Sequence, residues 1–273
     1  MAAKVLRVGK VAIGGKRPVF ILGPCVIESE KFVWRMAREI LKMCRAEDVD
    51  LIFKASYDKA NRTSVKSFRG LGSRQGCEML AAIGQELKIP VTTDVHSPDE
   101  AKLAGEMIDL LQIPAFLCRQ TDLLKAAAQT GRAVNVKKGQ FLAPWDMKNI
   151  AGKLTEFGND KFCFTERGTT FGYNNLVADM RSLYWIREAG YRVIFDATHS
   201  VQRPGGNGAS TGGDRSMAPV LARAAVAAGI DGLFIETHPQ PDQSPSDGPN
   251  MIPLAQMESL LRKLRDIHEV SRS

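Results

Sequence analysis

Short apolar runs recur along the chain, and most of them end in a polar residue. Eight of them are six or seven residues long and rich in β-branched or large apolar side chains. Their nearly continuous apolar character is typical of strands buried on both faces, as in a parallel sheet. They occupy residues 19–24, 51–56, 90–95, 110–115, 133–138, 162–167, 193–199 and 232–238.

In the segments between these runs, apolar residues recur at the spacing typical of helices. The first such segment, 29–44, begins at Ser29, a residue type that caps helix N-termini, and several later segments end in Gly, a common helix stop. Eight alternating strand and helix units predict an α/β fold, the (β/α)8 or TIM barrel. An open doubly wound sheet is the alternative, weakened because the first turn reads GPCVIES rather than GxGxxG. The other helical segments are 74–88, 97–107, 120–131, 144–158, 175–190, 216–229 and 253–270.

The pattern indicates one barrel domain over residues 1–273. Residues 1–18 alternate and turn, which predicts a β-hairpin that caps the barrel floor. Two segments after the seventh and eighth strands, 203–215 and 239–251, are rich in Gly, Pro, Ser or Asn. We expect them to be mobile loops at the active site.

Composition places the chain among ordinary globular proteins. Of 273 residues, 44% are hydrophobic and 25% are charged, which excludes a disordered or collagen-like chain. No apolar run is long enough to span a membrane, and the N-terminus lacks the apolar core of a signal peptide, so we expect a cytoplasmic protein. The five cysteines show no CxxC spacing and are predicted to be free thiols.

The chain is basic, with 37 Lys and Arg against 30 Asp and Glu, a net charge of +7. The basic residues are dispersed and aromatics are only 7%, so neither nucleic acid nor a membrane surface is indicated as a partner. Small phosphorylated or carboxylated substrates fit this charge better.

Polar side chains stand at the ends of the predicted strands, where barrel enzymes build their sites. Five of them are cations on separate segments that a closed barrel brings to one mouth. Clustered cations repel unless anions neutralise them, so the pocket is predicted to bind more than one anionic group. These cations are Lys54, Lys59, Arg62, Lys137 and Arg167.

A second set at the strand ends consists of metal-ligand types. A thiolate, an imidazole and two carboxylates suit a borderline divalent ion such as Zn²⁺, Fe²⁺, Mn²⁺ or Co²⁺. All four come from one arc of the barrel, because strands one, seven and eight are neighbours in a closed ring. The residues alone leave a metal site and an ordinary buried cluster equally open. They are Cys25, His199, Glu236 and Asp247.

Several long motifs resemble one family. GPCVIES, FKASYDKANRTS, TTDVH, GRAVNVKKGQFLAPWDM, TERGTTFGYNNLVADMRSL, FDATHSVQRPGG and ETHPQPDQSPSDGPN lie between residues 20 and 254. They are similar to the 3-deoxy-D-manno-octulosonate 8-phosphate synthases, also called 2-dehydro-3-deoxyphosphooctonate aldolases. The resemblance implies a TIM-barrel transferase of lipopolysaccharide precursor biosynthesis that condenses phosphoenolpyruvate with D-arabinose 5-phosphate and water. It also implies a homotetramer.

The resemblance assigns substrate-binding roles. Phosphoenolpyruvate would be held by residues matching Lys54, Lys59, Gln112, Lys137 and Arg167. The pentose phosphate would be held by Asn61, Arg62 and Thr63, with Arg62 reaching across from a neighbouring subunit. Substrate-binding Arg119 would lie with Phe116 near a subunit boundary.

The family divides into metal-dependent and metal-independent classes, with Cys or Asn respectively in the first-strand motif. GPCVIES resembles the metal-dependent class, which implies one divalent ion per subunit on Cys25, His199, Glu236 and Asp247. Asp94, His96 and Asp247 are candidates for proton transfer, and Lys59 also counts among the catalytic candidates.

Three rival functions stay open. A related synthase uses erythrose 4-phosphate, but typically carries a shorter KPRTS where this chain has KANRTS. A Schiff-base aldolase would use Lys54 or Lys137 as nucleophile. A barrel that binds phosphorylated metabolites without turnover is the non-enzymatic alternative.

Overall fold

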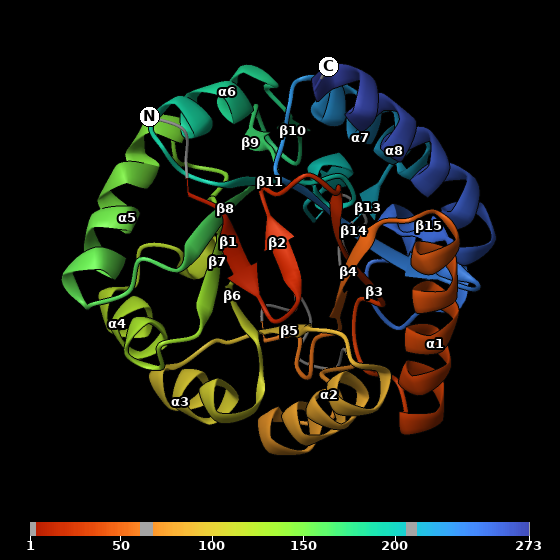
Figure 1. The fold of residues 1–273 in the computed structure, drawn as a ribbon, viewed down its shortest axis with the longest axis horizontal. Helices are drawn as coiled ribbons and strands as arrows, with labels where there is room; N and C mark the ends of the chain where they lie inside the picture. Colours follow the sequence, from red (N-terminus) through yellow and green to blue (C-terminus); the bar gives the residue numbers. More distant parts are fainter. Residues whose placement is uncertain (1–3, 61–67, 206–211, 273) are drawn as a thin grey trace.

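A computed structural model describes residues 4–60, 68–205 and 212–272 of the chain. Eight parallel strands are paired in sequence order, and the last pairs with both the seventh and the first. The sheet is therefore a closed barrel, as the alternating pattern predicts, and not an open doubly wound sheet (Figure 1). The strands are β3 (Val19–Gly23), β4 (Asp50–Lys54), β5 (Val91–Asp94), β6 (Leu110–Ile113), β7 (Ala133–Lys137), β8 (Phe162–Glu166), β11 (Val193–Asp196) and β14 (Gly232–His238).

Helices surround the barrel as an outer ring (Figure 1). In the first helix the Ser29 side chain accepts a hydrogen bond from the Phe32 backbone N–H, the expected N-cap. Its buried positions, among them Val33, Ile40 and Cys44, recur at helical spacing and pack on the strands. The helices are α1 (Glu30–Ala46), α2 (Ser73–Leu87), α3 (Pro98–Met107), α4 (Thr121–Gln129), α5 (Met147–Glu156), α6 (Arg181–Glu188), α7 (Ala218–Ala227) and α8 (Met257–Arg272).

The predicted helix over 175–190 was wrong in its first third. Residues Leu176–Val177 form strand β10, which pairs with β9 (Thr169–Thr170) as a small antiparallel hairpin. Gly172 and Asn174 adopt positive φ angles that turn the chain between these strands. The helix begins only at Arg181, whose backbone N–H donates to the Asp179 side chain at 3.0 Å.

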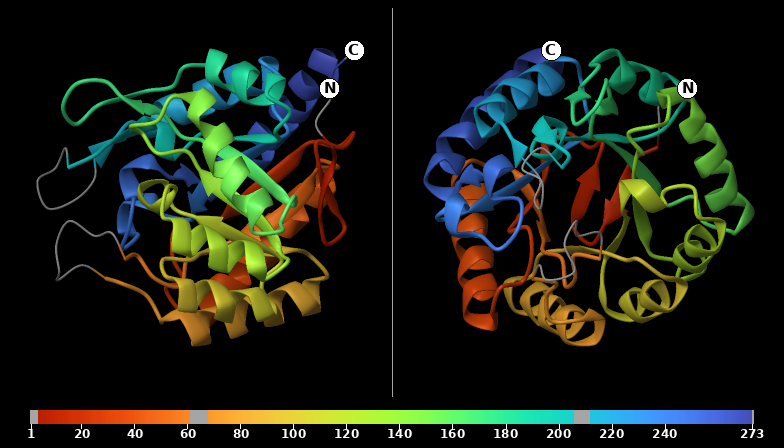
Figure 2. Two further views of the ribbon diagram at one scale, coloured as in Figure 1. Left: turned by 90° about the vertical axis from the view of Figure 1, so that its left-hand side faces the viewer. Right: turned by 180° about the vertical axis from the view of Figure 1, so that it is seen from behind.

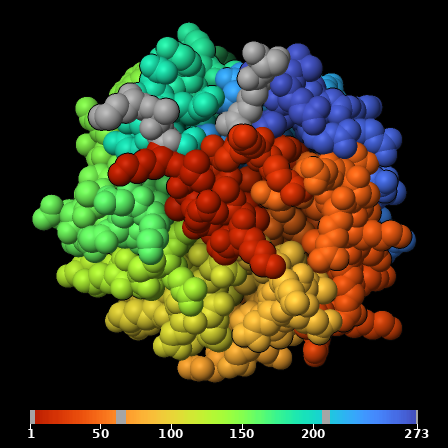
Figure 3. All heavy atoms as spheres, viewed as in Figure 1, coloured from red at the N-terminus to blue at the C-terminus, as the bar shows by residue number. Residues whose placement is uncertain are grey.

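The N-terminal hairpin is present and covers the floor of the barrel, as predicted. Strands β1 (Leu6–Val8) and β2 (Val11–Ile13) pair antiparallel. Figure 3 shows this N-terminal segment at the middle of the barrel face. Its buried side chains pack against residues from the N-terminal halves of the strands, including Ile52, Ile194 and Phe234. The floor is therefore closed by apolar packing, which leaves the opposite end for the site.

The loops after β11 and β14 lie at the opposite end from the hairpin (Figure 2). In the first, β12 (Gln202–Arg203) pairs with β13 (Gly212–Gly213). The second contains two 3₁₀ turns, η5 (Pro241–Gln243) and η6 (Gly248–Asn250), and then β15 (Ile252–Pro253) beside β14. Arg215 joins the two loops by donating to the Gly248 carbonyl at 3.0 Å. Their mobility stays a prediction.

The remaining short elements are 3₁₀ turns at loop bends: η1 (Ala115–Leu117), η2 (Pro144–Asp146), η3 (His199–Val201), η4 (Arg215–Met217) and η7 (Leu254–Gln256). Within the described ranges, none of the helices has the length and apolar character needed to cross a bilayer.

Candidate active site

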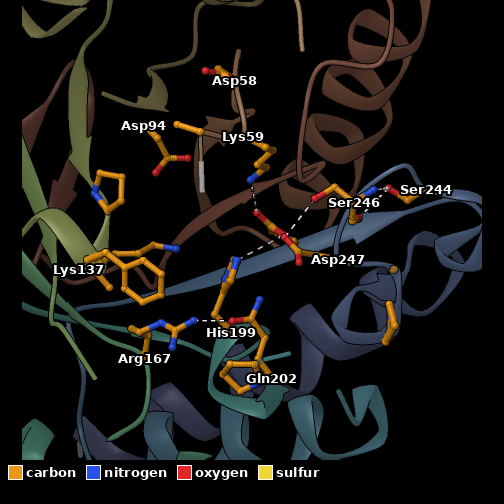
Figure 4. A pocket seen from close by; sticks show the side chains of 18 of the residues that line it. Asp58, Lys59, Asp94, Lys137, Arg167, His199, Gln202, Ser244, Ser246 and Asp247 are labelled. Atoms are coloured by element: carbon orange, nitrogen blue, oxygen red, sulfur yellow. Dashed lines mark hydrogen bonds and ion pairs between the residues drawn. The ribbon is translucent and has the colours of Figure 1, made fainter. Parts of the chain in front are cut away.

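A cavity of about 700 Å³ opens at the carboxyl ends of the barrel strands. Figure 4 shows side chains from several segments directed into it, including Lys59, Asp94, Lys137, Arg167 and His199. Because parallel strands end together at this rim, residues far apart in sequence meet here, as the sequence predicts. Other lining residues are Lys54, Asp58, His96, Phe116, Gln140, Gln202, Glu236, Asp242, Ser244, Ser246 and Asp247.

Four cations face this cavity from four segments. Lys54 ends β4, Lys59 follows it, Lys137 ends β7 and Arg167 follows β8. Each is at most 9% exposed. Two of them form close ion pairs: the Nζ of Lys54 lies 2.5 Å from Oε1 of Glu236, and the Nζ of Lys137 lies 2.7 Å from an oxygen of Asp196. The fifth predicted cation, Arg62, lies outside the described residues.

Arg167 holds an unused donor. Its Nη2 donates to Oε1 of Gln202 at 2.6 Å, whereas its buried Nη1 has no hydrogen-bond partner among the residues that the structure describes. Burial lowers the pKa of this guanidinium, partly offset by Asp196 and Glu166. An unpaired buried guanidinium N–H is costly, so this wall of the cavity is built to receive an anionic acceptor.

Asp94 lies among the cations. Burial alone would raise its pKa, but the ammonium groups of Lys54, Lys59 and Lys137 hold the pKa well below its usual range. Its carboxylate also accepts hydrogen bonds from Ser56 and Gln112, both at 2.6 Å. Asp94 is thus a fixed anion at neutral pH, which favours a role as electrostatic partner of the surrounding cations.

His96, at the same wall, has a defined tautomer. Its Nδ1 lies 3.0 Å from Oε2 of Glu100, an oxygen that also accepts from the His96 backbone N–H and from the Tyr57 hydroxyl. Because a carboxylate only accepts, Nδ1 carries the proton, and in the neutral imidazole Nε2 then carries the lone pair. His96 is therefore a suitable candidate proton acceptor.

Replacing Glu100 with glutamine is expected to lower stability at pH 7 by about 1–3 kcal/mol, because the bonds to His96 and Tyr57 weaken. Burial would raise the pKa of Glu100, but the hydrogen bonds from His96 and Tyr57 hold it at about 2. This folded-state pKa lies below the unfolded value, so the stabilisation is complete above about pH 4.5 and disappears as pH falls through 2. Urea unfolding across pH should show the two proteins converging in acid. A constant difference would contradict this assignment.

Three of the four predicted metal ligands converge. One ligand atom each from Cys25, Glu236 and Asp247 lie within 4.8 Å of one another. The Cys25 Sγ lies 2.9 Å from the Ser246 hydroxyl and 3.1 Å from an Asp247 oxygen. Burial raises the pKa of the Cys25 thiol, and the Asp247 and Glu236 carboxylates raise it further. A buried thiol beside two carboxylates fits a divalent cation, because the ion's charge favours the thiolate and offsets the repulsion.

The fourth predicted ligand, His199, stands beside this cluster. Its Nε2 lies 3.7 Å from Oε2 of Glu236. Its Nδ1 lies 2.8 Å from an Asp196 oxygen, close enough for an ion pair although out of line for a hydrogen bond. Asp196 thereby directs Nε2 toward the cluster, an arrangement found around metal-bound histidines. Burial would raise the pKa of Asp196, but His199 and Lys137 hold it very low. Asp196 ends β11 and was not among the predicted site residues.

The remaining predicted residues differ in where they lie relative to the main cavity. Gln112 is fully buried beneath the cavity and does not line it. Arg119 lines a separate cavity of about 320 Å³ with Lys153. Phe116 lines the main cavity and is 56% exposed. Asn61, Arg62 and Thr63 fall outside the described residues.

The polar residues of the site that sequence reasoning missed include Ser56, Gln140 and Gln202. Gln140 and Gln202 line the cavity, and Ser56 joins Lys59 to Asp94. Ser56 is the last residue of the predicted strand 51–56 and Gln140 lies two residues after the predicted strand 133–138, so their positions at strand ends were the available signal.

The fold and this site define a barrel of the class that binds anionic substrates at the carboxyl ends of its strands. The sequence model of the DAHP synthetase I family matches residues 3–272, and the chain belongs to this family. Proteins named 2-dehydro-3-deoxyphosphooctonate aldolase are similar over nearly their whole length. The one from Granulibacter bethesdensis is 55% identical over 99% of this chain and 96% of its own. The one from Geobacter sp. strain M21 is 56% identical over 97% of each.

Proposed function

We propose that this chain is a 2-dehydro-3-deoxyphosphooctonate aldolase, a transferase that condenses phosphoenolpyruvate with D-arabinose 5-phosphate and water. The products are 3-deoxy-D-manno-octulosonate 8-phosphate and phosphate, within lipopolysaccharide precursor biosynthesis. The observation that carries this proposal is the cavity itself, where four buried cations face a cluster of metal-ligand residues. Relatives of that name, more than half identical over nearly the full chain, support it.

The cations account for the choice of two anionic reactants. Phosphoenolpyruvate and a pentose phosphate repel each other in water, and bringing them together is mainly orientation and electrostatic work. Arg167 offers a planar pair of donors for a carboxylate or phosphate, and Lys54, Lys59 and Lys137 act as point charges. The remaining phosphate contacts are assigned to Asn61, Arg62, Thr63 and Arg119.

The condensation forms one carbon–carbon bond and one carbon–oxygen bond, the latter to water, and breaks the carbon–oxygen bond to phosphate. C3 of phosphoenolpyruvate attacks the sugar aldehyde, water adds at C2, and phosphate leaves from C2. Asp94 and the Nε2 of His96 lie on the cavity wall and are assigned to proton transfer, with Asp247 as a further candidate. Gln112 supports this wall from below.

We assign Cys25, His199, Glu236 and Asp247 as ligands for one divalent ion per subunit, with Zn²⁺, Fe²⁺, Mn²⁺ and Co²⁺ as candidates. Bound there, such an ion supplies Lewis acidity for the aldehyde oxygen or the attacking water. The residues themselves orient one another: Asp196 holds His199, and Lys54 holds Glu236.

The proposed assembly is a homotetramer in the cytoplasm, with Arg62 shared across a subunit interface. Exposed aromatic side chains on the loops and helices of one part of the ring support an interface there, since large exposed apolar surfaces mark contact sites. They are Phe116, Phe141, Trp145 and Tyr184.

Phosphate release from phosphoenolpyruvate plus arabinose 5-phosphate tests the reaction and the metal together. We expect release that prior chelation abolishes and a divalent ion restores. Release that is indifferent to chelation would keep the synthase and reject the metal role. If release occurs only with erythrose 4-phosphate, the related synthase is the correct function.

The Schiff-base rival is tested separately. A nucleophilic lysine must be neutral, whereas the ammonium groups of Lys54 and Lys137 are engaged with Glu236 and Asp196. Borohydride treatment in the presence of arabinose 5-phosphate or erythrose 4-phosphate is therefore expected to leave the protein mass unchanged. A trapped adduct would overturn the proposed mechanism, and substrate binding without any turnover would indicate a metabolite-binding protein.

A further inference from the structure

A chain of hydrogen-bonded side chains runs beneath the cavity from β8 to the end of β4. Thr165 Oγ1 donates to Asn135 Oδ1 at 2.8 Å, and Asn135 Nδ2 donates to Gln112 Oε1 at 3.0 Å. Gln112 Nε2 donates to one Asp94 oxygen, and the Ser56 hydroxyl donates to the other, both at 2.6 Å. Asp94 is 9% exposed and the other four are fully buried.

The charge of Asp94 sets the direction of every bond in this chain. A carboxylate can only accept, so Gln112 must turn its amide nitrogen toward Asp94 and its oxygen toward Asn135. Asn135 must then present its nitrogen to Gln112, which leaves its oxygen to accept from Thr165 and, at 3.6 Å, from the Cys163 thiol. Each amide therefore has one orientation that satisfies its neighbours.

The far end of the chain reaches the cavity. The Ser56 hydroxyl donates a hydrogen bond to Asp94 and accepts one from Lys59 Nζ at 3.0 Å. Lys59 and Asp94 line the cavity, whereas Asn135 and Gln112 do not. The orientation of a buried amide is in this way linked to one cation and one anion of the site.

We propose that Asn135 is a positioning residue for the condensation. By holding the Gln112 amide in one orientation, it fixes the Asp94 carboxylate and, through Ser56, the ammonium of Lys59. This inference rests on the proposed function and names a contributor to the same cavity.

The test is Asn135→Asp, a substitution of nearly equal size. The new carboxylate cannot donate to Gln112, so two acceptors face each other and the Gln112 amide is driven to turn over. A mispaired buried acceptor of this kind is expected to lower kcat/KM at pH 8 by about 10-fold to 100-fold. Once protonated, the new carboxyl donates as the amide did, so activity relative to wild type should rise between pH 8 and pH 6.

The relative measurement isolates the effect. The charged or titratable groups that act on Asp94 are Lys54, Lys59, Lys137 and His96. Wild type and Asn135→Asp share these groups. Dividing the kcat/KM of the variant by that of wild type at each pH therefore removes the titration of these groups from the pH profile.

Thr165→Val is the matched control. It removes one buried hydrogen bond at the β8 end of the hydrogen-bonded chain, away from Ser56, and preserves the direction of all the others. We expect its kcat/KM to stay within about threefold of wild type, with a ratio that is constant across pH. If both variants lose activity equally, with ratios to wild type that do not change with pH, Asn135 has only a structural role and the inference is overturned.

If Asn135→Asp does not fold, Gln112→Glu provides a second test. It replaces the amide donor to Asp94 with an acceptor, one link closer to Asp94, and is judged by the same pH profile.

Phosphoenolpyruvate binding, measured by titration calorimetry without sugar, separates this inference from the proposed reaction. Affinity about tenfold weaker at pH 8 in Asn135→Asp, and unchanged in Thr165→Val, supports the inference even if wild type releases no phosphate. A wild-type protein that binds phosphoenolpyruvate but releases no phosphate would refute only the proposed reaction. Equal affinities in all three proteins would overturn the positioning role, and a wild-type protein that does not bind phosphoenolpyruvate would refute both.

Discussion

Replacing Cys25 with alanine is expected to remove the divalent ion and to lower turnover by about 100-fold or more. The thiol is fully buried, and its Sγ is one of the three ligand atoms that converge, with those of Glu236 and Asp247. Without the sulfur, the remaining set loses its softest donor, and ion affinity falls accordingly. Lewis acidity is worth several kcal/mol of barrier, which corresponds to a loss of this size. Metal content by mass spectrometry and phosphate release measure the two effects.

Cys77→Ala is the matched control, because Cys77 is an equally buried thiol on α2 that does not line the cavity. It should lose about 1 kcal/mol of stability from packing and keep both ion and activity. The family resemblance adds a second variant: Cys25→Asn should retain partial activity without metal, since one class carries Asn there. Full turnover of chelated Cys25→Ala would refute the metal role, and a folded but inactive Cys25→Asn would argue against interchange of the classes.

Lys54→Met is expected to destabilise the metal-free protein by about 3–5 kcal/mol. Lys54 and Glu236 are each 1% exposed, and the lysine also donates to the Cys25 carbonyl at 3.0 Å. Removing one partner of a buried ion pair leaves the other charge uncompensated. Burial would raise the pKa of Glu236, and Lys54 is the main group that holds it low instead. Urea unfolding in the presence of a chelator measures the loss.

Adding Zn²⁺ should restore part of this stability, because the ion would again neutralise Glu236. Arg38→Met is the comparison, since Arg38 pairs with Glu86 while both side chains are more than half exposed. That surface pair should contribute less than about 1 kcal/mol. A Lys54→Met protein as stable as Arg38→Met would show that the buried pair does not matter for folding.

The sequence by itself determined the barrel and the rim at which the candidate site residues stand. Apolar runs of strand length alternate with helical spacing eight times, and local burial and chain connectivity allow few other folds for that pattern. Once the barrel is inferred, strand ends such as Lys137, Arg167 and Glu236 must share one mouth, and the structure places them at one cavity. The first part of the helix predicted over 175–190 failed because the turn at Gly172 and Asn174 pairs β10 with β9, a local hairpin that helical periodicity does not reveal.

Only the tertiary structure decided which polar residues face the cavity and which lie beneath it. Gln112 and Lys54 are both polar residues within predicted apolar runs, yet Gln112 is buried beneath the cavity whereas Lys54 lines its wall. The pairing of Asp196 with His199, and the direction of the hydrogen bonds from Thr165 to Asp94, depend on register between neighbouring strands. Register and side-chain orientation arise from packing across the whole barrel, so no local pattern in the chain specifies them.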